Sequence, residues 1–220
     1  MKEKIKKLFA KKEKTQKMKG QSLVEITLTL PILLILLSGL IEFGFMLNYY
    51  LAITDATREV ARITSNWSHT YIDPDTNNTF YEVGVAKAIY ALEPDDANDT
   101  TRKVKILENR VNCPTEKLEK GVCDNDIIIS VYSIGEDSSV LVESHHWDDN
   151  DIRQASRFSA AVIQDRLTDI DSTNAGAVVV EIFYNYEQVL GLPWLEMVPD
   201  PVLLYAYTVM PLSSAEPEAN

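Results

Sequence analysis

Two unlike parts of this chain meet at Lys19-Gly20-Gln21-Ser22-Leu23-Val24-Glu25. Before the junction, residues 1–20 carry nine Lys against two Glu, a local charge of +7. Residues 21–220 carry the rest of the formal net charge of -12, which is -19. An acidic body is a poor binder of nucleic acid, because phosphate contacts need Lys and Arg. Nucleic acid is therefore excluded as a partner of the folded part.

An apolar run follows the junction. Sixteen uncharged residues extend from Ile26 to Ile41, and the pattern resumes past Glu42 to Leu47. About 22 residues of helix at about 1.5 Å each give about 33 Å, which matches a hydrocarbon core of about 30 Å. The Lys-rich flank keeps the N-terminus in the cytoplasm. The sequence thus predicts a single-pass protein of the cytoplasmic (inner) membrane with an extracytoplasmic C-terminal domain, rather than a buried core helix.

Several residues in this region carry a family resemblance. Gly20 precedes Glu25, and then come Leu30-Pro31, Ile41-Glu42-Phe43-Gly44 and Ala56-Thr57-Arg58-Glu59-Val60-Ala61-Arg62. In order and spacing this set resembles the TadE-like pseudopilins of tight-adherence (Flp-type) pilus systems. The resemblance covers about residues 19–63 and leaves the rest of the chain without a motif of equal specificity.

The resemblance implies a processing site and a charged assembly residue. A prepilin peptidase would remove the leader after Gly20, so that the mature chain begins at Gln21 and Glu25 takes its fifth position. A carboxylate in the bilayer centre costs roughly 2.5 to 3.5 kcal/mol, and less near the edge, so it calls for a partner. The new α-amino group of Gln21, in the same or a neighbouring subunit, supplies the opposite charge. The alternative is that Glu25 sits solvated at the headgroup boundary.

Two further residues of the apolar run stand out. Pro31 removes a backbone hydrogen bond to the carbonyl of Thr27, which favours a kink. Glu42 is a second carboxylate in the run. It marks either a contact with another helix or a position at headgroup level near the outer face.

Beyond the membrane the helix is expected to continue as the spine of a soluble domain. Apolar residues recur there at spacings of three and four, namely Ile53, Ala56, Val60, Ile63 and Trp67. This stripe requires a covering layer, as in pilin-like folds. We therefore expect an α+β, pilin-like fold: a leader over 1–20, a transmembrane assembly helix over 21–47, and an extracytoplasmic domain over 48–220 with its helical spine at 48–65.

The domain itself shows helix and strand patterns. A turn built by Asp, Asn and Pro after Ser65 leads to a capping box at Thr79–Glu82 and a short helix ending near Glu93. A second helix is predicted over Ile152–Ile170. Strands are predicted over Lys103–Leu107, Asp126–Ile134, Val140–Val142, Ala177–Glu187 and Val202–Met210. The first two are expected to pair as a hairpin. Trp194, between the last two, is expected to pack over a sheet edge, and the alternative is that it is exposed and docks on membrane or a partner.

The two cysteines, Cys113 and Cys123, fall in the loop of that predicted hairpin. Outside the cytoplasm a disulfide closing this short loop is the natural interpretation, and it stabilises by roughly 3 kcal/mol if unstrained. Inside the cytoplasm they would be two free thiols. A zinc site is not expected, because two Cys without nearby His or further Cys do not complete one.

Glu143 to Asp151 is the best metal candidate, with His145 and His146 among acidic and amide groups. Adjacent His side chains usually point apart, however, so an exposed loop is the preferred interpretation and no metal or other cofactor is expected.

No nucleophile–base pair, glycine-rich phosphate loop or ligand cluster of known spacing appears in the sequence, so an enzyme is not expected. The leading hypothesis is a TadE-like minor pseudopilin acting in assembly of an adhesive pilus. Its partners would be the membrane, prepilin peptidase, other pilins and the assembly machinery. The alternatives are a single-pass anchored extracytoplasmic binding module and a pseudopilin of a related secretion system.

Overall fold

The computed structural model describes residues 2–92, 125–135, 139–146, 154–167, 175–195 and 201–215, with the backbone alone for residues 2–19, 21, 166, 167 and 195. The chain forms two compact units. One comprises Met1–Phe45 with Gln188–Val198, and the other comprises Met46–Glu187 with Pro199–Asn220.

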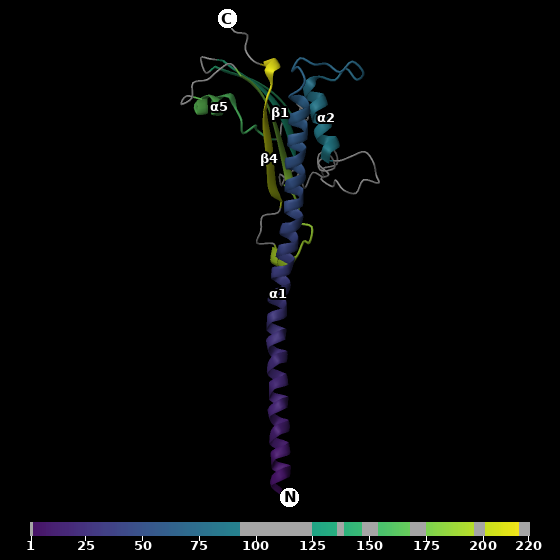
Figure 1. Ribbon diagram of the computed structural model, residues 1–220, viewed down its shortest axis with the longest axis vertical. Coiled ribbons are helices and arrows are strands. Elements are labelled where there is room, and N and C mark those ends of the chain that lie inside the picture. The colour runs from purple at the N-terminus through teal and green to yellow at the C-terminus, as the bar shows by residue number, and fades with distance from the viewer. Residues whose placement is uncertain are drawn as a thin grey trace. The chain divides into compact units, whose positions relative to one another are not determined.

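Helix α1 (Lys2–Thr64) is the longest helix described (Figure 1). It has 63 residues, and Pro31 lies inside it. The hydroxyls of two threonines near the proline each donate to the carbonyl four residues earlier: Thr27 to Leu23 at 2.8 Å and Thr29 to Glu25 at 2.7 Å. These hydroxyls therefore do not serve the Thr27 carbonyl that Pro31 leaves without its helical partner. The kink stays a prediction.

The second unit is built on a four-stranded antiparallel sheet in the order β2-β1-β3-β4. Its strands are β1 (Asp126–Ile134), β2 (Val140–His146), β3 (Ala175–Tyr186) and β4 (Val202–Pro211). Helices α2 (Phe80–Leu92) and α5 (Ala160–Leu167) and the 3-10 turns η1 (Pro193–Leu195) and η2 (Ser213–Ala215) complete the described elements. A long apolar helix followed by this domain confirms the α+β class.

The predicted hairpin between Lys103–Leu107 and Asp126–Ile134 is wrong. Strand β1 pairs with β2 along one edge, where Val131 lies opposite Glu143, and with β3 along the other, where Val131 lies opposite Val178. Because a strand has two edges, β1 has none left from Ile128 to Ile134. Residues 103–107 lie outside the described part of the chain, as do Cys113 and Cys123, so the disulfide stays a prediction.

One face of the sheet carries the core. The stripe predicted for α1 faces it: Ile53, Ala56 and Val60 are buried, and Trp67 packs against the same cluster. Helix α2 covers the face beside α1, whereas α5 lies on the other side of the sheet (Figure 1). The apolar alternation predicted for β3 is confirmed, because Val178, Val180, Ile182, Tyr184 and Tyr186 all join this core.

Local hydrogen bonds fix the start of α2 as the sequence predicts. In the turn before it, the Asp73 carboxylate accepts from the backbone of Asp75 at 3.0 Å and from the Thr76 hydroxyl at 2.8 Å, which lowers the pKa of Asp73 below its ordinary value. The backbone N–H of Thr79 then donates to Glu82 Oε2 at 2.6 Å, and the N–H of Glu82 donates to the Thr79 hydroxyl at 3.4 Å. This is a capping box.

Gly84 sets how closely α2 approaches the sheet. A Cβ at this position would lie 2.5 Å from Ile129 Cδ1 and 3.3 Å from Thr64 Cγ2. We expect Gly84→Ala to lower the free energy of unfolding by about 1–3 kcal/mol, because overpacking outweighs the gain in helix propensity. Denaturant unfolding of the full chain in detergent micelles measures this. Ala substituted at exposed Lys87 in the same helix is the control, and an unchanged Gly84→Ala variant would contradict the close approach.

Candidate functional site

From Ser22 to Leu37, helix α1 presents apolar side chains on all sides. From Ser22 to Leu37 every described side chain is exposed, with Leu28 and Leu36 each at 67%. The helix segment Ser22–Thr64 is long and apolar enough to cross a membrane. A helix that is apolar around its whole circumference needs an apolar environment on every side. This surface is therefore suited to lipid or to other apolar helices.

Glu25 lies on this surface and is exposed. Among the described residues its carboxylate has no hydrogen-bond or ion-pair partner, and the side chain of Gln21 is outside the described set. Gly20 has open space around it, since a Cβ there would meet nothing within 4 Å. The cleavage site and the charge pair thus remain predictions.

A short segment contacts α1 further along the same unit. We call residues 188–195 the collar. The Glu42 carboxylate, only 8% exposed, accepts hydrogen bonds from the backbone N–H groups of Val189 at 2.9 Å and Leu190 at 3.0 Å. One turn earlier, Ser38 Oγ accepts from Trp194 Nε1 at 2.8 Å. Gly191 between these contacts has φ +52°, a conformation that glycine adopts without strain.

The collar answers the question that the sequence left open for Glu42, which does mark a contact, with a segment of its own chain. The indole N–H of Trp194 donates to the serine of α1. The packing of Trp194 over a sheet edge stays a prediction. The sequence signal for this site was the pair Ser38 and Glu42, two polar residues four apart in an apolar run, which fall on one helix face.

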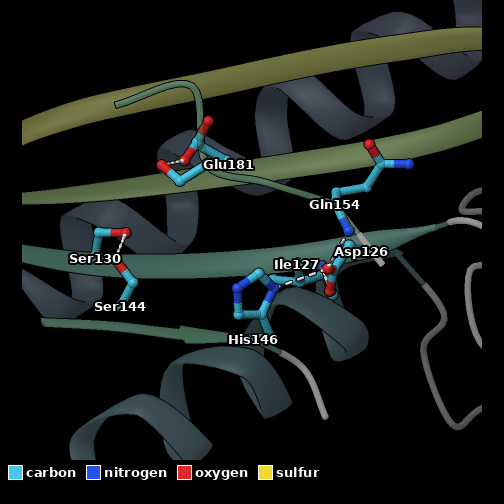
Figure 2. A network of polar contacts seen from close by, with 8 residues as sticks. Asp126, Ile127, Ser130, Ser144, His146, Gln154 and Glu181 are labelled. Atoms are coloured by element: carbon cyan, nitrogen blue, oxygen red, sulfur yellow. Dashed lines mark hydrogen bonds and ion pairs between the residues drawn. The ribbon is translucent and has the colours of Figure 1, made fainter. Parts of the chain in front are cut away.

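Two buried carboxylates lie on the sheet face opposite the core, Asp126 in β1 and Glu181 in β3, each 0% exposed. Asp126 Oδ2 accepts from His146 Nδ1 at 2.9 Å and from the backbone N–H of Gln154 at 3.3 Å (Figure 2). Its other oxygen accepts from the N–H of Ile127 at 2.9 Å. The nearby Ser130 and Ser144 hydroxyls lie 2.8 Å apart across β1 and β2.

Glu181 gathers three donors. The hydroxyl of Ser156 donates to Oε2, and the backbone N–H of Arg157 and the hydroxyl of Tyr205 donate to Oε1 at 3.0 and 2.8 Å. The Arg157 guanidinium stands 4.0 Å from the centre of the Tyr205 ring. Burial, and then the Glu181 carboxylate, raise the pKa of Tyr205 above its ordinary value.

These contacts explain why the helix predicted over Ile152–Ile170 is shorter, beginning at Ala160. Residues 154–159 are not helical, and their polar groups bind the sheet: Gln154 and Arg157 donate to carboxylates, and the Phe158 carbonyl accepts from the Tyr132 hydroxyl. We call residues 154–159 the strap. The buried carboxylates of Asp126 and Glu181 hold the strap against the sheet, which is a structural role.

The two adjacent histidines point apart, as neighbouring residues of a strand do. His146 reaches Asp126, whereas His145 stacks on Tyr81 at 3.8 Å and its Nε2 lies 3.1 Å from Glu143 Oε1. Consecutive residues of a strand face opposite sides of the sheet. Within the described residues no group of three or more His, Cys, Asp or Glu is placed to hold a metal ion. Residues 147–153 lie outside them.

The lining of a pocket of about 350 Å³ in the second unit includes two serines, a histidine and a glutamate, the residue types of a hydrolase triad. His69 Nδ1 lies 3.5 Å from Ser214 Oγ, at the limit of hydrogen bonding, and that hydroxyl contacts the carbonyl of Trp67 at 3.4 Å. Glu143 contacts His145, not His69. No contact among the described residues gives His69 the orienting acid that such a relay requires.

The comparison with known families singles out the helix. Residues 20–62 match the family model described as TadE-like protein. The N-terminal segment is TadE-like. No curated protein and no solved structure matches the chain.

The match confirms the resemblance seen in the sequence. We call residues 20–62 the TadE-like segment. It contains Gly20, Glu25 and Pro31, together with Ser38 and Glu42, which the collar contacts. It continues into the spine, where Ile53 and other stripe residues are buried against the sheet. The collar itself lies outside the match, as do the sheet and the buried carboxylates.

Proposed function

We propose that this chain is a TadE-like minor pseudopilin that acts in assembly of a tight-adherence pilus. The supporting observation is that the family match includes residues 22–37 of α1, where the apolar side chains are exposed on every side. In this proposal residues 1–20 are a cytoplasmic leader, 21–47 span the inner membrane, and 48–220 form the extracytoplasmic domain.

In the proposed mechanism, the apolar surface of α1 contacts lipid before assembly and other pilin helices after it. In the membrane, lipid covers the exposed apolar surface of the TadE-like segment. During assembly, the helices of other pilins replace the lipid, and packing and interhelical polar contacts then drive association. Glu25 contributes a carboxylate that the α-amino group of a processed Gln21 neutralises.

The N-terminus of the protein from its own cells tests this function. Mass spectrometry of the purified protein is expected to find Gln21 as the first residue, because prepilin peptidase cuts after Gly20. The control is the same protein from cells without the peptidase, which should begin in the leader. An intact leader in peptidase-containing cells would refute the proposal and favour the anchored binding module, which keeps its leader.

A further inference from the structure

We propose that the collar is a membrane-interface element whose apolar side chains enter the headgroup-proximal layer of the outer leaflet. This goes beyond the pilus role and shares with it only the insertion of α1 in a bilayer. The occupant of the collar's exposed surface is lipid, from the same membrane that the helix crosses.

Depth along α1 is the first argument. A hydrocarbon core of about 30 Å takes about 20 residues of helix, so it needs most but not all of the proposed spanning segment 21–47, and Glu42 lies toward the outer end of that segment. The collar binds α1 at Ser38 and Glu42, through the indole of Trp194 and two backbone N–H groups. These hydrogen bonds hold it at the level where the hydrocarbon gives way to headgroups.

The chemistry of the collar is the second argument. Its eight residues, Gln-Val-Leu-Gly-Leu-Pro-Trp-Leu, carry no charge. Val189 is 54% exposed and Trp194 is 41% exposed. The collar thus presents apolar side chains to its surroundings, on the unit that contains the spanning helix. Trp is enriched at membrane interfaces, where one end of the ring is apolar and the other is polar.

Charge burial is the third argument. A carboxylate at the edge of a membrane is unfavourable unless it is hydrogen-bonded. Both oxygens of Glu42 accept a backbone N–H of the collar, and the Trp194 N–H donates to Ser38. The collar therefore covers the polar groups of this turn of α1 and turns apolar side chains outward, which suits contact with acyl chains.

Depth-dependent fluorescence quenching tests the inference. The full chain is reconstituted in phosphatidylcholine–phosphatidylglycerol vesicles whose acyl chains carry bromine either at carbons 6 and 7 or at carbons 11 and 12. The parent chain is compared with Trp194→Phe, and the difference in emission isolates Trp194. A matched Trp67→Phe variant isolates the tryptophan at the C-terminal end of α1, which packs against Tyr71.

We expect the Trp194 emission to be quenched about twofold or more by the shallow bromines and less by the deep ones, as for an interfacial ring. Trp67 should not respond to either lipid. If the bromines do not quench Trp194, the inference is wrong. Quenching by acrylamide would then mean that water covers the ring, and no quenching by acrylamide would mean that a second copy of the chain covers it. Stronger quenching by the deep bromines also overturns the inference. The vesicles need neither peptidase nor pilus, so this result and the N-terminus of the cellular protein stand or fall separately.

Discussion

Replacing Glu181 with alanine is expected to lower the free energy of unfolding by about 3–5 kcal/mol, the largest change in stability that we expect from one side chain here. The variant leaves three donors at a buried position without their acceptor: the Ser156 hydroxyl, the Arg157 N–H and the Tyr205 hydroxyl. Each loses its hydrogen bond in a site where Glu181 is 0% exposed. Denaturant unfolding of the full chain in micelles measures the loss.

Two variants serve as controls for this result. Glu181→Gln keeps one acceptor oxygen and nearly the same volume, so it should lose less than the alanine variant. Glu59→Ala removes an exposed carboxylate from α1 and should stay within about 0.5 kcal/mol of the parent chain. If Glu181→Ala is as stable as Glu59→Ala, the Glu181 carboxylate does not hold the strap, residues 154–159, against the sheet.

Alkaline titration gives an independent readout of the same site. Burial and the Glu181 carboxylate keep the pKa of Tyr205 above that of an unfolded tyrosine, so the folded state holds a proton that the unfolded state has lost. Stability should therefore fall as pH rises above about 10. In Glu181→Ala the second cause is absent, and tyrosinate absorbance should appear at lower pH than in the parent.

Local patterns predicted the elements that depend on neighbouring residues. The apolar run and the stripe after it gave α1, and the Thr79–Glu82 box gave the start of α2, because helices and caps are fixed by side chains three or four apart. Alternation identified β3 and placed Glu181 on its other face. The alternation of side chains along a strand predicts which residues share a face, but it does not predict what covers that face.

The errors all come from contacts between distant parts of the chain. The partner of β1 was misassigned because pairing depends on the whole sheet, and the helix before Ala160 gave way to a strap because carboxylates on β1 and β3 bind its backbone. The collar joins Trp194 to Ser38, 156 positions apart. The sequence contained both partners of this contact but no pattern that connects them.

Alanine in place of Glu25 should separate processing from assembly. We expect the variant to be cut after Gly20 and to insert normally, because the cleavage site and the apolar run are intact, and yet to reduce surface pili by at least about tenfold. Neutralising a charge in the bilayer stabilises by roughly 2.5 to 3.5 kcal/mol near its centre and by less at its edge. About 1.4 kcal/mol already changes an equilibrium constant tenfold, so we expect at least that loss in assembly. The readouts are the mass of the membrane-bound protein and the number of pili counted by electron microscopy.

The loss of pili in this variant would come from the amine that the carboxylate leaves behind. In the proposed assembly, the Glu25→Ala variant keeps the α-amino group of a processed Gln21 without its counter-ion in an apolar bundle. Breaking a buried pair by removing one partner is strongly destabilising. Glu25→Gln keeps the size and loses the charge, so it should also impair piliation. Glu59→Ala, an exposed carboxylate further along the same helix, should not. Normal piliation in the alanine variant would show that Glu25 is merely solvated at the headgroup boundary and that assembly depends on the apolar surface of α1 alone.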